Sequence, residues 1–148
     1  MAKKENVAEN TELRSHCPVN YALEMVGDRW ALLILRDMVF RGRRTYGEFL
    51  ASEEKIATNI LSTRLRQLKE RGILQQAKRK GPYELTEKGL DLIPLLFEMV
   101  LWSSKYDPHS EAARIPRLVE LIEKNNRKVS EEVISQVRRG EPVVKNYL

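Results

Sequence analysis

The chain has 148 residues, of which 42% are hydrophobic and 32% are charged. This length and composition predict one soluble globular unit with some appended structure, and they exclude a wholly disordered chain. The formal net charge is +5, which raises the question of an anionic partner. Twelve Lys or Arg and five Asp or Glu lie between Arg36 and Lys80, a local net charge of +7. We call this segment the basic block.

The chain holds one cysteine, Cys17, which excludes an internal disulfide framework, a zinc knuckle and a CxxC redox pair. Residues 1–14 are polar and unpatterned, and we expect a flexible lead-in without the apolar core of a signal peptide. The longest apolar run, around Ala31 to Leu35, is too short to span a membrane. We therefore expect a cytoplasmic protein with no membrane partner.

Two helices are predicted after the lead-in. Pro18 suits a first helical position, Gly27 ends the first helix, and Asp28 can cap the second by accepting backbone N–H groups. The second helix, about Arg29 to Phe40, is apolar around most of its circumference. Such a helix is expected at the centre of the core.

The next segments have the outline of a helix-turn-helix. A short helix is predicted over Thr45 to Ser52, and a longer basic helix over Thr58 to Arg71, with Gly72 as its end. The sequences "ILQQA", "KRKGP" and "YEL" then predict a strand, a turn and a returning strand, so that residues 74–85 form a β-hairpin. A hairpin in this position is a wing.

A long helix is predicted from Thr86 to Tyr106, with a bend at Pro94. It carries more apolar surface than a small domain can bury, at Leu92, Leu95, Leu96, Met99, Val100 and Trp102. This surface either covers the chain's own core or meets a partner chain.

Two further helices are predicted in the tail. The first runs from Pro116 to Asn125, and the second from Glu131 to Arg139, with Ser130 as its cap and Gly140 and Pro142 as its end. The expected organisation is a DNA-binding and dimerisation domain at residues 15–107, followed by a C-terminal helical extension at 108–148.

The helix from Thr58 to Arg71 has two different faces. At about 100° per residue, one narrow stripe holds Ala57, Leu61, Leu65 and Leu68, and the opposite face holds Asn59, Thr63, Arg66 and Glu70. Short polar side chains followed by long cations suit a helix that enters the major groove, although a merely solvated basic face is as common.

The candidate contacts on this helix are Thr58, Asn59, Ser62, Thr63, Arg64, Arg66 and Lys69, with Arg64 and Lys69 expected mainly at phosphates. The candidate backbone and wing contacts are Arg43, Arg44, Thr45, Tyr46, Lys78, Arg79 and Lys80.

The segments "CPVNYALEMVGDRWALLILRDMVFRGRRTYGEF", "ILSTRLRQLKERGIL" and "YELTEKG", in this order, resemble the HxlR-type winged helix-turn-helix transcriptional regulators. The resemblance runs from about Cys17 to Trp102. It implies a mainly α fold with a small wing, and a bacterial or archaeal homodimer that binds DNA. Dimerisation is implied through the first helix and the long helix after the wing. The wing looks shorter than in many members, and the tail beyond about Pro108 exceeds the family core.

The resemblance also aligns Cys17 with a family cysteine that senses electrophiles or oxidants in some members. Cys17 lies just before a predicted helix, whose positive end favours the thiolate. The alternative is a small buried residue beside a helix start.

Other functional classes find little support in the sequence. His16 and His109 are the only histidines, so no metal site is expected. No phosphate-binding glycine loop and no nucleophile with a positioned base is evident, so neither a cofactor nor an enzyme activity is expected. The sequence identifies no small-molecule effector. We expect a sequence-specific double-stranded DNA-binding transcriptional regulator, the alternatives being a protein-interaction module or an RNA-binding module that lacks specific DNA recognition.

Overall fold

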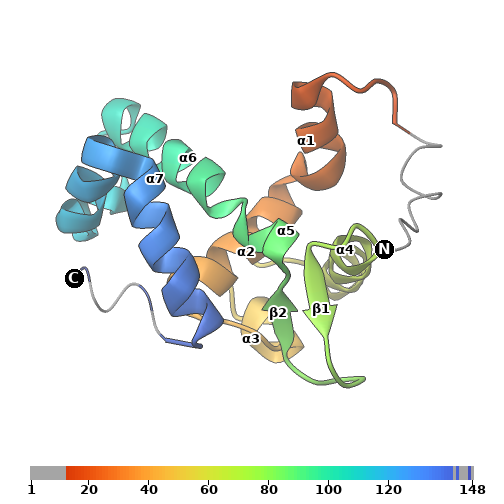
Figure 1. Ribbon diagram of the computed structural model, residues 1–148. Helices are drawn as coiled ribbons and strands as arrows, with labels where there is room; N and C mark the ends of the chain where they lie inside the picture. The colour runs from red at the N-terminus through yellow and green to blue at the C-terminus, as the bar shows by residue number, and fades with distance from the viewer. Residues whose placement is uncertain (1–12, 142, 144–146, 148) are drawn as a thin grey trace.

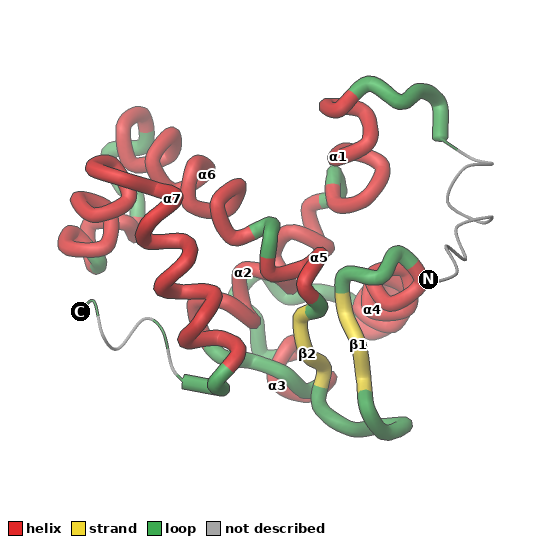
Figure 2. Tube along the Cα trace, in the orientation of Figure 1, coloured by secondary structure: helices red, strands yellow, loops and turns green. Residues whose placement is uncertain are grey.

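A computed structural model describes residues 13–141, 143 and 147 (Figure 1). The predicted lead-in therefore lies mostly outside the described residues, as does Pro142. Figure 2 shows helices over most of this part of the chain and one short hairpin. The elements are α1 (Pro18–Val26), α2 (Arg29–Arg41), α3 (Tyr46–Leu50), α4 (Thr58–Glu70), β1 (Leu74–Gln76), β2 (Tyr83–Leu85), α5 (Glu87–Leu90), α6 (Ile93–Tyr106), the short 3₁₀ helix η1 (Glu111–Arg114) and α7 (Pro116–Arg138).

The first two helices begin and end as their sequence predicts. Pro18 is the first residue of α1, and Gly27 follows its last turn. The Asp28 carboxylate accepts the N–H of Ala31 at 3.0 Å and so caps α2. Helix α2 buries Ala31, Ile34, Leu35, Met38 and Val39, and it is the central core helix.

The helix-turn-helix and its wing are confirmed. Helix α3 is shorter than predicted, whereas α4 ends one residue before the predicted Arg71, and Gly72 adopts the left-handed conformation at φ 72°. Strands β1 and β2 pair antiparallel with Leu74 opposite Leu85 and Gln76 opposite Tyr83.

Helix α4 rests on the core through its leucine stripe. Leu61, Leu65 and Leu68 are buried, as predicted, and α4 packs against α2 and α3. Ala57 was expected on the same stripe, but it is exposed because it lies before the first turn, at the N-cap. The opposite face of α4 is thereby turned away from the core.

The predicted long helix after the wing is wrong, because the chain forms two helices there. Helix α5 ends at Leu90, and α6 begins at Ile93 after a turn through Asp91 and Leu92. Pro94 lies in the first turn of α6, where its missing N–H leaves no hydrogen bond unmade. The proline therefore starts a helix and does not bend one.

The tail is also arranged differently from the prediction. Helix α7 runs from Pro116 to Arg138 with a kink at Asn125, whose φ of −161° and ψ of 87° are not helical. The Asn125 side chain accepts the N–H of Lys128 at 3.1 Å and starts the second half of α7. Ser130 is not the cap, because it is buried within that half and donates to the Asn126 side chain at 2.8 Å.

The C-terminal extension packs mainly on α6. Leu118, Ile122, Val129 and Val133 of α7 are buried, and the interface between α6 and α7 is the most extensive between any two elements. Within the described residues, no helix has the length and apolar character that crossing a membrane requires.

Candidate nucleic-acid interface

The polar face of α4 is open at its centre. Asn59, Ser62, Arg66 and Lys69 are exposed, and 67% of the Arg66 side chain is accessible. Thr63 is half-buried and donates its hydroxyl to the Asn59 carbonyl at 2.9 Å. Glu70 lies 3.8 Å from Arg66 in an exposed pair of the kind that contributes little stability and breaks readily. Arg66 is therefore available to an incoming partner.

Helix α3 holds the N-terminal end of α4. The Tyr46 hydroxyl donates to the Thr58 carbonyl at 3.1 Å and accepts the Ser62 hydroxyl at 3.4 Å. Thr45 caps α3 by accepting the N–H of Glu48 at 3.3 Å. The two contacts of Tyr46 bring three of the predicted site residues, Tyr46, Thr58 and Ser62, together at one edge of α4.

A groove of about 410 Å³ runs between α4, the start of α3 and the wing. It is lined by Tyr46, Ser62, Leu65, Arg66, Lys69, Glu70 and Tyr83. Leu65, Glu70 and Tyr83 were not among the predicted site residues. Tyr83 reaches the groove because its N–H donates to the Arg44 carbonyl, a contact between distant residues that no local sequence pattern reveals.

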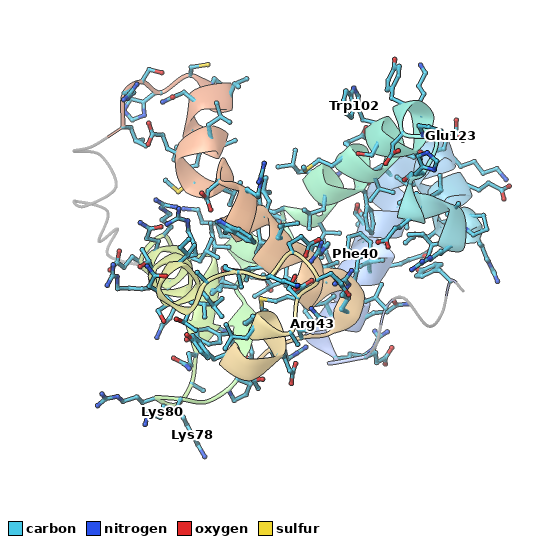
Figure 3. The ribbon with its side chains drawn as sticks, turned by 180° about the vertical axis from the view of Figure 1, so that it is seen from behind. Phe40, Arg43, Lys78, Lys80, Trp102 and Glu123 are labelled. Carbon is cyan, nitrogen blue, oxygen red and sulfur yellow. The ribbon has the colours of Figure 1, made fainter. Side chains whose placement is uncertain are left out.

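The wing carries its charge at the turn. Lys78, Arg79 and Lys80 are exposed, and Figure 3 shows Lys78 and Lys80 extending from the hairpin at the end of the molecule opposite Trp102. Within the described residues, none of these three cations has an ion-pair partner. The wing is tied to α4 by Lys69, which donates to the Gln76 side chain at 3.1 Å.

Arg43 does not lie where the sequence suggested. Its guanidinium donates to Asp37 at 3.1 Å, and only 20% of the side chain is exposed. Arg44 turns toward the C-terminal extension and donates to the Val137 carbonyl at 3.5 Å, while its own carbonyl accepts the N–H of Tyr83 at 2.8 Å. Both arginines thus help to hold the scaffold of the site.

The buried carboxylate of Asp37 is a feature that the sequence reasoning missed. Asp37 is 2% exposed and accepts hydrogen bonds from Arg36, Arg41 and Arg43. The helical spacing of the sequence could have indicated this burial, because Ile34, Asp37 and Met38 fall on one buried face of α2.

The same arginines reach the turn between α3 and α4. Arg36 donates to Glu54 at 2.9 Å and to Ser52 at 3.2 Å, and Arg41 donates to Glu53. The Arg36 guanidinium holds the pKa of the Glu54 carboxyl far below its ordinary value, and Arg41 lowers the pKa of Glu53. Helix α2 thereby fixes the turn on which α4 depends.

Arg64 is also engaged within the protein. Its Nε and Nη2 atoms donate to the two oxygens of Asp28 at 2.7 and 3.1 Å. The Arg64 guanidinium lowers the pKa of the Asp28 carboxyl. The predicted phosphate contact by Arg64 conflicts with this forked pairing.

Cys17 is exposed, so the interpretation as a small buried residue is wrong. It occupies the N-cap position of α1, where the backbone N–H groups of Asn20 and Val19 lower the pKa of its thiol below the ordinary value of 9.0. Among the described residues, no group of three or more His, Cys, Asp or Glu side chains is placed to hold a metal ion.

Comparison with known proteins agrees with this geometry. The model of the HxlR-like helix-turn-helix family matches residues 25–111, a range that covers α2 to α6 and begins after Cys17. The uncharacterized HTH-type transcriptional regulator MT3179 of Mycobacterium tuberculosis is 39% identical over 102 residues, which cover 66% of this chain and 63% of that relative's length. YybR of Bacillus subtilis, another uncharacterized HTH-type transcriptional regulator, is 30% identical over 124 residues, which cover 80% of this chain and 96% of the relative.

A solved structure has the same arrangement. The crystal structure of PA1607, a proposed transcription factor, superposes with a TM-score of 0.57 at 38% identity, over 66% of this chain and 72% of that one. The predicted winged helix-turn-helix fold and the resemblance noted from the sequence are both confirmed. This chain belongs to the HxlR-like helix-turn-helix family, and its relatives MT3179 and YybR are named as transcriptional regulators.

Proposed function

We propose that the protein is a transcriptional regulator that binds double-stranded DNA at specific sequences as a homodimer in the cytoplasm. The observation that carries the proposal is the exposed polar line on α4 beside an exposed cationic wing. Asn59, Ser62 and Arg66 are exposed on the outer face of α4, and Arg79 is exposed at the turn of the wing. Lys78 and Lys80 extend from that turn (Figure 3). A helix and a wing that project together fit a major groove and the adjacent backbone.

The base-reading role falls to the first two turns of α4 and to Arg66. An Arg fork can bond both acceptors of a guanine, and an Asn amide can do the same for an adenine. We therefore assign base contacts to Thr58, Asn59, Ser62, Thr63 and Arg66, and phosphate contacts to Thr45, Tyr46, Lys69, Lys78, Arg79 and Lys80. Arg43, Arg44 and Arg64 leave the contact set because all three guanidinium groups bond inside the protein.

The dimer is proposed to form through α6 and α1. Leu95, Met99, Trp102 and Tyr106 follow one another at the spacing of a single helix face, and they are 41%, 44%, 69% and 62% exposed. Val19 and Leu23, which are 68% and 60% exposed, make a similar face on α1. Apolar faces of this kind on two helices of a small protein favour burial against a second copy.

The dimer is tested by Trp102→Asp, measured by sedimentation. We expect a monomer in which α4 still folds. Its affinity for a duplex with two half-sites should be greatly reduced, because each half-site then binds a separate monomer independently. A Trp102→Asp protein that sediments as a dimer contradicts the assigned interface.

DNA binding itself is tested by competition between a specific duplex, a random duplex and RNA of equal length. The protein should bind the specific duplex more tightly than the random duplex or the RNA. Its affinity for the specific duplex should fall steeply as the salt concentration rises, because binding releases counterions. Equal affinity for all three nucleic acids, or none for duplex at low salt, contradicts the proposal and leaves a protein-interaction or RNA-binding role.

Redox or electrophile sensing by Cys17 is the second part of the proposal. Its support is the exposed thiol at a helix N-cap with a lowered pKa. Oxidant or quinone treatment should change the DNA affinity of the wild-type protein and leave that of Cys17→Ser unchanged. An equal response from Cys17→Ser contradicts the sensing role.

A further inference from the structure

Two arginines of α4 point away from the proposed DNA face and toward the junction of α1 and α2. Arg64 binds both carboxylate oxygens of Asp28, and Arg71, at the C-cap of α4, donates to the Met25 carbonyl at 3.2 Å. We call residues 25–28 the α1–α2 corner. Arg64 and Arg71 are seven residues apart, about two helical turns, so they leave α4 on the same side and meet the corner at two separate points.

These contacts supply what the leucine stripe of α4 lacks. Leu61, Leu65 and Leu68 turn one face of α4 to the core, but apolar contact is non-directional and sets the rotation of the helix about its own axis only coarsely. The fork of Arg64 on Asp28 is directional, because both N–H···O bonds must be satisfied at once. A second anchor about 10 Å further along the helix restricts its tilt as well.

Asp28 joins the two helices through one carboxylate. It accepts the N–H of Ala31 as the cap of α2 while it holds Arg64 of α4. The start of the central core helix and the middle of α4 are therefore set against each other by a single side chain, of which 34% is exposed.

We propose that Arg64 and Arg71 are positioning residues, which set the rotation and tilt of α4 on the α1–α2 corner so that Asn59, Ser62 and Arg66 meet base edges. The proposal rests on the DNA-binding function proposed above. Arg64 acts here through the placement of its neighbours on α4 and makes no contact with DNA. Residues 25–28 also end α1, so the orientation of α1 affects the orientation of α4 through these two arginines.

The experiment compares Asp28→Ser, Arg64→Gln and the double variant with the wild-type protein. Serine is a good N-cap but is too short to hold the guanidinium, so Asp28→Ser removes the fork and keeps the cap of α2. Affinity is measured for the duplex that the wild-type chain selects from a random library, and for random duplex of equal length, at several salt concentrations. Arg127→Gln is the control, because it breaks the exposed pair of Arg127 with Glu131 on α7, away from the corner. Thermal unfolding confirms that each variant is folded at the assay temperature.

Positioning predicts that Asp28→Ser and Arg64→Gln each lower the ratio of specific to random affinity about tenfold, which is about the effect of one mismatched base pair. The double variant should lose no more than either single variant, because all three remove the same ion pair. The salt dependence should stay at the wild-type value, and Arg127→Gln should leave both quantities unchanged.

Two results would overturn the positioning role. If Arg64→Gln weakens specific and random binding alike and lowers the salt slope by about 0.9 while Asp28→Ser does neither, Arg64 is a phosphate contact. If wild-type specificity survives in both single variants, the pair only stabilises the fold. A wild-type chain that shows no preference for any selected duplex instead contradicts the proposed function, and that outcome is visible before any variant is made.

Discussion

The basic block divides into two regions that use the same residue types in opposite ways. In the first, at the end of α2 and the turn before α4, Arg36, Arg41 and Arg43 are paired with Asp37, Glu53 and Glu54. In the second, from the middle of α4 to the wing, Arg66, Lys69 and the three wing cations are exposed. Residues 36–57, which we call the neutral region, hold five Lys or Arg and four Asp or Glu, whereas residues 58–80, the charged region, hold seven Lys or Arg and one Glu. The surplus positive charge of the block, +6 of +7, therefore lies mainly in the charged region.

The difference shows that the net charge of a segment does not tell which of its residues present positive charge to a partner. Arginine serves both regions, because its fork can satisfy a buried carboxylate as well as a phosphate or a guanine. The neutral region makes the scaffold rigid, and the charged region stays available to a polyanion.

The largest effect should come from breaking the neutral region with Asp37→Asn. The change leaves three arginines without their shared carboxylate, and we expect a loss of roughly 3 kcal/mol in the free energy of unfolding, the low end for a buried pair since the arginines are part-exposed. Chemical denaturation measures it. Glu53→Gln is the control, because Glu53 is exposed and its pair should count for less than about 1 kcal/mol. An Asp37→Asn protein as stable as the wild type would remove Asp37 from the scaffold.

The next effect tests the charged region through Arg66→Ala. If Arg66 binds a guanine, its loss should cost about 1–3 kcal/mol at one base-pair position and relax the preference there. Binding of a panel of single-base variants of the selected duplex measures this. A uniform loss across the panel would reassign Arg66 to a phosphate.

The wing should give a smaller effect that does not depend on sequence. Lys78→Ala with Lys80→Ala should weaken specific and random duplex alike and reduce the salt slope by about 0.9 for each phosphate that is no longer neutralised. Titrations at several salt concentrations measure the slope. A wing that reads bases would instead change the sequence preference.

The smallest effect concerns acid. Because Arg36 lowers the pKa of Glu54 below its ordinary value of 4.5, their pairing stabilises the fold above that pH and is lost as the pH falls toward the folded-state pKa. Stability should therefore decline below about pH 4.5, and Glu54→Gln should make the decline shallower. Unfolding curves between pH 7 and pH 3 check this. An unchanged acid slope in Glu54→Gln would show that other carboxylates determine it.

Local chemistry explains which parts of the fold could be predicted from the sequence. Pro18, Gly27, Asp28 and Gly72 mark helix ends by their own backbone preferences, so α1, α2 and the end of α4 follow from the sequence. Pro94 was misplaced because a proline fits a first turn as well as it bends an interior, and only the preceding break decides between the two.

The candidate site was predictable only in part, for a tertiary reason. The outer face of α4 follows from helical periodicity, which places Asn59 and Arg66 opposite the leucine stripe. Arg64 pairs with Asp28, which is 36 positions away in the sequence, and Arg43 turns back to Asp37 on the buried face of α2. Neither pairing follows from the periodicity of α4. An arginine on a basic helix looks the same in the sequence whether it meets a carboxylate or a phosphate.

The measurement that tests the central claim most directly is the selection of duplexes from a random library by the wild-type protein. If the charged region of the block reads DNA in a homodimer, the recovered sites should converge on an inverted repeat with half-site centres about 10 base pairs apart. Recovered sequences without convergence, at a salt concentration where binding is detected, would contradict sequence-specific recognition by α4.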